Sequence, residues 1–140
     1  MSAADGGRPL VGIVLVSHSA AVATAVAELA TGLAGGGANA PVTAAGGTPD
    51  GGLGTSAELI TAAAHRADQG AGLAILADLG SAVLTVKTLI AEEDELPPGT
   101  RLVDAPFLEG AVAAVVTAST GADVDAVAQA AREAYEYRKL

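Results

Sequence analysis

The sequence predicts a single-domain α/β fold, in which a mostly parallel, twisted sheet of about four strands carries helices on both faces. Short apolar runs alternate along the chain with longer stretches whose apolar residues recur at helical spacing. This alternation is typical of parallel sheets with crossover helices. Hydrophobic residues make up 51% of the chain and aromatic residues only 2%, so the core has to be built from small aliphatic side chains.

The first strand is predicted at residues 10–16, where the continuous apolar run LVGIVLV indicates a buried position in the sheet. A helix follows from Ser19 and ends at the glycines of residues 35–37. The second strand is predicted at residues 40–44. We place it near an edge of the sheet, because Pro41 has no N–H to donate to a neighbouring strand.

A glycine-rich loop, residues 46–54, follows the second strand and leads into a helix at residues 57–67. Either Thr55 or Ser56 can cap this helix. Glu58 stands three residues after Thr55 and would complete a capping box with it.

The second half of the chain continues the alternation and ends in two helices. A Pro-Pro-Gly segment, residues 97–99, breaks a helix before the last strand, and Asp123 is placed to cap the last helix. The predicted elements here are strands at residues 72–77 and 100–103 and helices at residues 82–93, 107–118 and 124–137.

Charge and composition exclude several classes of function. The net charge of −9 argues against nucleic acid, whose binding needs a basic stripe, but permits steering of a basic protein partner. The acidic run from Glu92 to Glu95 is interpreted as a solvated helix end. The chain has no cysteine, which excludes disulfides and thiolate chemistry.

The chain is expected to be a cytoplasmic protein with one domain. No apolar run approaches the roughly 18 residues of a membrane span. Residues 1–9 lack the hydrophobic segment of a secretory signal and are interpreted as a flexible N-terminal arm. Residues 10–140 form the predicted domain.

Polar residues follow each of the first three predicted strands. Ser17, His18 and Ser19 follow the first, the glycine-rich loop follows the second, and the segment from Asp78 to Ser81 follows the third. Because ligands bind beyond the carboxyl ends of parallel strands, we expect these segments to converge on one rim. Helix N-termini at that rim present free N–H groups that can hold an anion or a phosphate.

His18 is the candidate catalytic residue, and Asp78 is its candidate partner. Small neighbours leave the His18 ring accessible, and a carboxylate on one ring nitrogen would leave the other free as a nucleophile. The structural alternatives are a packing histidine at a helix start and an aspartate that merely caps the next helix. His65, beside Arg66 near a helix end, is predicted to be a surface residue.

Other chemistries fit the sequence poorly. The segment GLGTSA matches a dinucleotide-binding pattern, with Asp78 at the distance of a ribose contact, but it opens the second helix in a chain too short for both halves of that fold. The loop has no lysine for a Walker motif, the first strand ends without carboxylates, and no G-x-S-x-G elbow occurs. Candidate metal ligands are too few, and no cofactor or metal is predicted.

Four segments together resemble the phosphotransferase subunits of bacterial dihydroxyacetone kinase (the DhaM family). These segments are LVSHS, GLGTSA, ADLGSAVLTVKTL and, at residues 105–127, APFLEGAVAAVVTASTGADVDAV. The resemblance extends over nearly the whole chain from Leu10. It implies the fold of the mannose-type enzyme IIA domains of the phosphoenolpyruvate-dependent phosphotransferase system.

The resemblance implies a role for His18 as a phosphohistidine carrier. His18 would accept a phosphoryl group from the phosphocarrier HPr and pass it to ADP on the nucleotide-binding subunit of the kinase, supporting dihydroxyacetone phosphorylation. Asp78 would orient His18. The resemblance also implies a homodimer, and separate phosphocarriers because the chain stops at Leu140. The residues suited to a phosphate cradle are Ser19, Gly54, Thr55, Gly80 and Ser81.

Two alternatives stay open. The first is the enzyme IIA domain of a mannose-type sugar phosphotransferase system, which uses the same histidine with another acceptor; LADLGSA together with PFLEG favours the kinase subunit. The second is a non-catalytic module that binds an anion at the same rim. Replacement of His18 would leave the activity of such a module unchanged.

Overall fold

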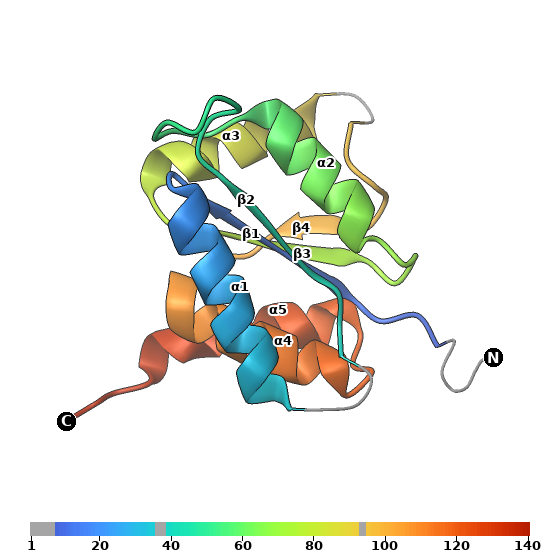
Figure 1. The fold of residues 1–140 in the computed structure, drawn as a ribbon. Coiled ribbons are helices and arrows are strands. Elements are labelled where there is room, and N and C mark those ends of the chain that lie inside the picture. Colours follow the sequence, from blue (N-terminus) through green and yellow to red (C-terminus); the bar gives the residue numbers. More distant parts are fainter. Residues whose placement is uncertain (1–7, 36–38, 93–94) are drawn as a thin grey trace.

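The computed structural model describes residues 8–35, 39–92 and 95–140. Their centre is a four-stranded sheet of order β2-β1-β3-β4 in which every neighbouring pair is parallel. Figure 1 shows helices on both sides of this sheet, which confirms the predicted fold class. The elements are β1 (Gly12–Ser17), α1 (Ala20–Ala34), β2 (Val42–Gly46), α2 (Ala57–Ala67), β3 (Leu73–Ala77), α3 (Gly80–Ala91), β4 (Thr100–Leu102), α4 (Phe107–Ser119), α5 (Val124–Glu133) and the 3₁₀ turn η1 (Ala134–Glu136).

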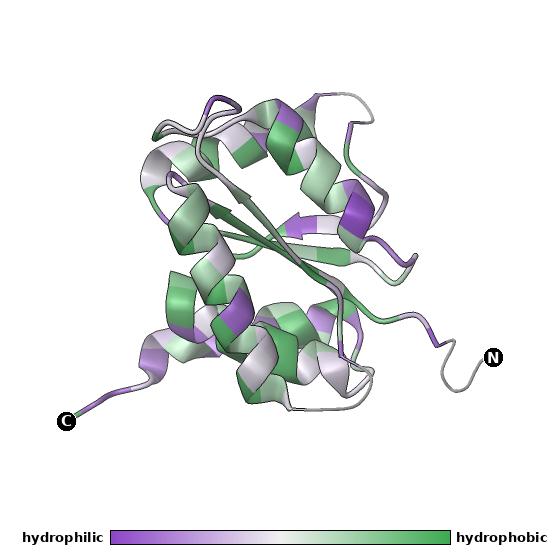
Figure 2. Ribbon diagram, viewed as in Figure 1, coloured by the Kyte–Doolittle hydropathy of each residue, from purple (hydrophilic) through white to green (hydrophobic). Residues whose placement is uncertain are grey.

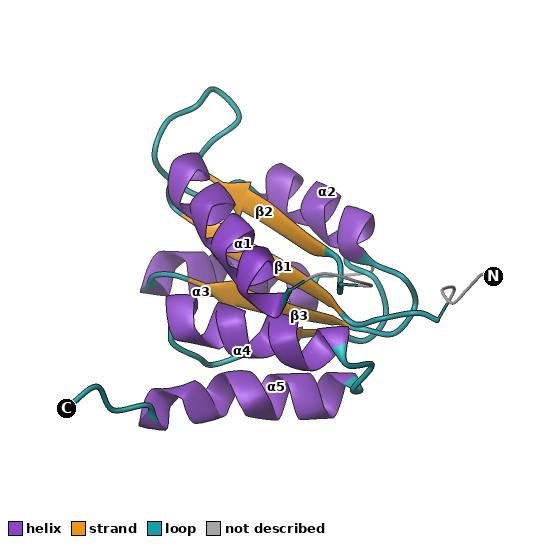
Figure 3. Cartoon of the chain, turned by 60° about the horizontal axis from the view of Figure 1, so that its bottom comes forward, coloured by secondary structure: helices purple, strands orange, loops and turns teal. Residues whose placement is uncertain are grey.

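Alternating side chains of the central strands divide the core into two layers. Ile13 and Leu15 of β1 face a cluster shared with α1, α4 and α5. Val14 and Val16 face the other way, into a cluster shared with α2 and α3. Because both faces of the strand are covered, β1 is apolar except at its last residue, Ser17. Figure 2 shows the strand mostly in the colour of hydrophobic residues. In Figure 3, α5 lies alongside α4 on the outer side of one layer.

Strand β2 is an edge strand, as the sequence predicts. Pro41 immediately precedes it, and the Pro41 carbonyl accepts the N–H of Ile13 at 2.9 Å. Asp123 caps α5 as predicted, accepting the N–H of Ala126 at 2.9 Å.

The predicted capping box at the start of α2 is wrong. Ser56 is the N-cap and accepts the N–H of Leu59 at 3.2 Å, so Glu58 is the second helical residue rather than the third. The Thr55 hydroxyl is instead 3.0 Å from the hydroxyl of Thr85 on α3. Ser56, the other capping residue that the sequence offered, thus caps α2, while Thr55 contacts α3.

Helix bounds differ from the predictions mainly at two ends. Helix α3 begins at Gly80 rather than at residue 82. Helix α5 ends at Glu133, and the last turn, Ala134–Glu136, is a 3₁₀ turn. Tightening of the last turn is common because terminal carbonyls lack partners further along the helix.

Gly46 lets the end of β2 approach the start of α1. A Cβ atom built there would lie 2.3 Å from the Ser19 carbonyl oxygen and 2.7 Å from the Ala20 Cα. Both are backbone atoms, so only glycine fits without a shift of the chain. This close approach fixes the loop that carries His18.

Some sequence predictions lie outside the described residues. They are residues 1–7 of the predicted N-terminal arm, Gly36 and Gly37 of the glycine stop, and Glu93 and Asp94 of the acidic run. Within the described ranges, none of the helices has both the length and the apolar character to cross a membrane.

Candidate functional site

The loops after β1, β2 and β3 meet at one edge of the sheet. Ser17 at the end of β1 pairs with Gly46 on one side, and the preceding Val16 pairs with Ala77 on the other. Helix α1 leaves β1 toward one face, whereas α3 leaves β3 toward the opposite face. Residues after β1 and β3 therefore flank the crevice where parallel α/β sheets bind ligands.

Asp78 binds His18 at two points. The Asp78 Oδ1 atom is 2.9 Å from the Nδ1 atom of the His18 ring, and Oδ2 accepts the backbone N–H of His18 at 3.1 Å. Two further donors complete the carboxylate: the Ser17 hydroxyl at 2.8 Å from Oδ2 and the Leu79 N–H at 2.7 Å from Oδ1. Each carboxylate oxygen thus accepts two hydrogen bonds, which holds the group in one orientation.

These donors keep Asp78 ionised. Burial by itself raises the pKa of the Asp78 carboxyl, but the hydrogen bonds from His18, Ser17 and Leu79 together lower that pKa below its ordinary value. The carboxylate is an acceptor only, so the proton of the Asp78–His18 bond belongs to Nδ1. A neutral His18 ring therefore has its lone pair on Nε2.

Ser81 contacts the free nitrogen of His18. Its hydroxyl is hydrogen-bonded to Nε2, and since Nε2 carries the lone pair, Ser81 is the donor. The His18 side chain keeps 24% of its surface exposed, so this nitrogen lies at the rim rather than in the core. A hydroxyl donor and an unprotonated nitrogen therefore face each other at the point where an electrophile would arrive.

Gly80 and Ser81 form the open end of helix α3. This helix has no side-chain cap; its N-cap residue is Leu79. By contrast, Ser19 caps α1 and Ser56 caps α2. The uncapped N–H groups beside His18 are therefore those of α3, and they carry the positive end of the helix dipole.

The other predicted cradle residues support the loops around His18. The Gly54 N–H donates to the His18 carbonyl at 2.9 Å, and the Ser19 hydroxyl accepts the N–H of Val22. The Thr85 hydroxyl donates to the Ser81 carbonyl at 3.1 Å, so Thr55 has to be the donor in the Thr55–Thr85 bond. Thr55 thus reaches Ser81 through Thr85 rather than contacting His18.

The sequence interpretation missed two residues of this network. The sequence places Ser17 at the rim without assigning it a partner, and in the structure it binds Asp78. Thr85 lies four residues after Ser81, on the same face of α3. That spacing was a usable signal for Thr85, whereas the direction of the Ser17 side chain depends on strand pairing.

Asp78 does not cap α3 in the usual way. It accepts the N–H of Leu79, the residue before the helix, and turns its remaining bonds toward β1. His65 is exposed, as predicted, and its Nε2 atom donates to the Glu95 carbonyl at 2.9 Å.

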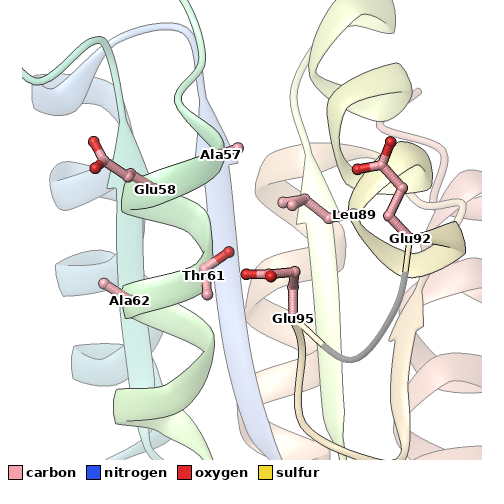
Figure 4. A pocket seen from close by; sticks show the side chains of 7 residues that line it. All are labelled: Ala57, Glu58, Thr61, Ala62, Leu89, Glu92 and Glu95. Atoms are coloured by element: carbon pink, nitrogen blue, oxygen red, sulfur yellow. The ribbon is translucent and has the colours of Figure 1, made fainter.

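A hollow between α2 and α3 lies apart from the predicted site (Figure 4). Its volume is about 650 Å³, and its lining residues are Ala57, Glu58, Thr61, Ala62, Leu89, Glu92 and Glu95. In Figure 4 the Glu95 side chain extends toward Thr61. None of the predicted site residues lines this hollow.

A smaller pocket of about 380 Å³ borders Asp78 on the side of β4. The titratable residues around it, besides Asp78, are Lys87, Asp104 and Tyr135. The Tyr135 hydroxyl donates to Asp104 at 2.7 Å, which connects the C-terminal turn to the end of β4.

The chain is similar to proteins of a known family. The EIIA-man family model, described as "PTS system fructose IIA component", matches residues 12–128. Phosphoryl donor subunit DhaM of dihydroxyacetone kinase 2 from Listeria innocua is 33% identical over 86% of the chain and 95% of its own length. The Escherichia coli DhaM subunit is 33% identical over 93% of the chain, which spans only 28% of that relative.

Solved structures show the same fold. A protein of unknown function, EF1359, is 34% identical with a TM-score of 0.71, covering 86% of the chain and 92% of that protein. A sigma-54 interaction domain protein from Enterococcus faecalis has a TM-score of 0.68 at 18% identity, with 93% of each chain covered, and is evidence for the fold alone. The chain belongs to the EIIA-man family of phosphotransferase system components, and it is a DhaM-like member of that family.

Proposed function

We propose that the chain is a phosphohistidine carrier. In this proposal, His18 accepts a phosphoryl group from phospho-HPr and passes it to ADP on the nucleotide-binding subunit of dihydroxyacetone kinase. The relatives named as phosphoryl donor subunits support this class of function. The observation that carries the proposal is the pairing of Asp78 with Nδ1, which leaves the Nε2 lone pair at the rim.

Phosphoryl transfer would proceed at Nε2 without a covalent change elsewhere in the chain. Nε2 forms a bond to phosphorus while the bond between phosphorus and the donor's nitrogen breaks, and the electron pair of that bond stays on the donor. The ionised Asp78 keeps its hydrogen bond to Nδ1 and stabilises the positive charge that develops on the ring. In the second transfer, an ADP phosphate oxygen attacks phosphorus and the Nε2–phosphorus bond breaks.

Ser81 would change its hydrogen-bond acceptor during this step. Its hydroxyl now donates to Nε2, so it has to release the lone pair before phosphorus can approach. The same hydroxyl can then donate to a phosphoryl oxygen, next to the N–H groups at the start of α3. Gly80 and Ser81 are therefore the residues that we assign to direct phosphate binding.

Ser19, Gly54 and Thr55 would act mainly by holding the cradle in place. Gly54 fixes the His18 carbonyl, Ser19 caps α1, and Thr55 braces α3 through Thr85. The proposal also keeps the wider expectations from the sequence: a cytoplasmic homodimer in which residues 10–140 form the phosphocarrier domain.

A second candidate function differs only in the acceptor. The family description names a fructose IIA component, which supports an enzyme IIA role in a mannose-type sugar phosphotransferase system. The same His18 chemistry would then deliver the phosphoryl group to a sugar-specific component rather than to ADP.

The test is the intact mass of the protein after incubation with phosphoenolpyruvate, enzyme I and HPr. We expect one acid-labile phosphoryl group on the wild type and on His65→Ala, and none on His18→Ala. His65 is the matched control because it is the other histidine of the chain and is exposed. An unmodified wild type beside fully charged HPr would overturn the carrier proposal in favour of an anion-binding module.

The acceptor is identified in a second step. The purified phosphoprotein is mixed with the kinase subunit loaded with ADP, or with membranes that contain a mannose-type sugar component. Loss of the phosphoryl group with formation of ATP supports the kinase role. Loss only to the sugar component supports the second candidate.

A further inference from the structure

We propose that Ser17 is a positioning residue for His18 and acts through Asp78. This inference rests on the proposed phosphoryl transfer for its kinetic consequence, but its structural consequence can be measured in the unmodified protein. Ser17 does not touch the reacting nitrogen. It controls the carboxylate that orients the ring.

Ser17 is unusual in its burial. Its exposed fraction is 1%, and it is the only polar side chain that is buried among the residues that the structure describes. A buried hydroxyl without partners is destabilising, so a hydroxyl in this position is expected to have specific bonds. Ser17 has two: it donates to Asp78 Oδ2 at 2.8 Å and accepts the N–H of Ser19 at 3.1 Å.

These two bonds fix the direction of the Ser17 hydroxyl. The ionised carboxylate cannot donate, so the single hydroxyl proton of Ser17 is directed to Asp78. The Ser19 N–H occupies an acceptor position on the same oxygen. One oxygen atom thus connects the residue after His18 to the carboxylate that binds the His18 ring. His18 is held between them.

Ser17 also supplies a side-chain hydrogen bond to Asp78 that no backbone donor replaces. Asp78 Oδ2 has two donors, the N–H of His18 and the hydroxyl of Ser17. Without the hydroxyl, a carboxylate only 17% exposed has lost one of its four donors. It is then freer to rotate about its Cβ–Cγ bond, which loosens its alignment with Nδ1. The negative charge is also less stabilised, so the pKa of Asp78 rises.

The groups around Asp78 do not duplicate this effect. His18 and Leu79 already donate to the carboxylate. Lys87, Asp104 and Tyr135 line the pocket on the side of β4, and no salt bridge joins any of them to Asp78 within the described part of the chain. Ser17 is therefore the uncharged side chain of β1 that binds the Asp78 carboxylate and helps to lower its pKa.

The experiment compares Ser17→Ala, Ser17→Cys and Ser17→Thr with a control, Thr43→Val. Thr43, on β2, also uses a partly buried hydroxyl, which donates to the carbonyl of Ala63 on α2 at 2.9 Å. The control therefore removes a comparable bond away from His18. Alanine removes the Ser17 donor, cysteine replaces it with a slightly larger and weakly donating thiol, and threonine keeps the hydroxyl.

Two readouts separate positioning from a purely structural role. The first is the titration midpoint of the Asp78 carboxyl carbon by NMR, which needs no phosphoryl transfer. The second is the rate of phosphorylation by charged HPr. We expect Ser17→Ala and Ser17→Cys to raise the midpoint by about half a unit to one unit and to slow phosphorylation about three- to tenfold. Ser17→Thr and Thr43→Val should retain the wild-type midpoint.

An unchanged Asp78 midpoint in folded Ser17→Ala and Ser17→Cys proteins would overturn the proposal and leave Ser17 a structural residue. The cysteine variant guards against a cavity effect of alanine, because the thiol fills the space of the hydroxyl. If the wild type itself accepts no phosphoryl group, the carrier function fails while the NMR result still decides the role of Ser17.

Discussion

Asp78 holds both the backbone and the side chain of His18, accepting the N–H at 3.1 Å and binding ring Nδ1 at 2.9 Å. The two contacts come from different oxygens of one carboxylate. A carboxylate bound only to the ring could move together with the ring relative to the backbone, whereas here it fixes the backbone and the ring of His18 relative to each other. The relationship makes Asp78 the residue whose replacement should affect the site most directly.

Asp78→Asn should slow phosphorylation of His18 by about ten- to hundredfold, because hydrogen bonds to a charged group are worth about 1.5–3 kcal/mol. An amide has one oxygen, and its NH₂ group would face two of the four donors that Asp78 accepts. The measurement is the time course of phosphorylation by intact mass. Asp104→Asn, in the neighbouring loop, should retain the wild-type rate; an equal effect of both variants would contradict a specific role for Asp78.

The lowered pKa of Asp78 predicts a pH dependence of folding stability. A carboxyl group whose pKa is lower in the folded state stabilises the fold above its unfolded pKa of about 3.9, and this contribution is lost as the pH falls through the folded pKa. The difference in unfolding free energy between wild type and Asp78→Asn should therefore be constant above about pH 5 and shrink below about pH 4. Urea unfolding from pH 7 to pH 3 measures it. A difference in unfolding free energy that grows as the pH falls would contradict the predicted direction of the pH dependence.

Gly46→Ala should destabilise the protein by about 2–3 kcal/mol, because the new Cβ atom would meet backbone atoms of Ser19 and Ala20. The strain falls on the loop that carries His18, so the amide signals of His18 and Ser19 should shift as well. Chemical denaturation and an amide NMR spectrum test both effects.

Gly32→Ala is the matched control for that substitution. Gly32 lies inside α1, and a Cβ atom there meets nothing within 4 Å. Alanine should stabilise the helix by about 0.5–1 kcal/mol. Equal destabilisation by both substitutions would show that the close approach at Gly46 is not the cause.

Tyr135→Phe should weaken the attachment of the C-terminal turn, by less than about 1 kcal/mol because the residue is 59% exposed. The hydrogen bond to Asp104 raises the pKa of Tyr135, and burial and the Asp104 charge add to this effect. A raised folded pKa means that the contribution is present below the unfolded pKa of about 10 and is lost as the pH rises through the folded value. The measurement is thermal unfolding of the wild type and of Tyr135→Phe from about pH 8 to pH 11. The difference between their unfolding temperatures should decrease as the pH rises.

The sequence by itself determined the architecture. Short continuous apolar runs bounded by turn residues favour strands covered on both faces, and Pro41 favours an edge position for β2, because these features depend on residue type and spacing. It also named His18 and Asp78 as neighbours, since parallel strands end at one edge of the sheet. That pairing needed no knowledge of side-chain directions.

Only the tertiary structure decided which polar groups meet. Of the two capping candidates for α2, Ser56 caps the helix and Thr55 instead binds Thr85, and Ser17 binds Asp78 from the adjacent strand. Such bonds join residues that are 30 and 61 positions apart, and their geometry depends on strand register and on how closely the helices pack. A hydrogen bond needs its atoms placed within a few tenths of an ångström. The spacing of residues along the chain does not predict strand register or helix packing to that precision.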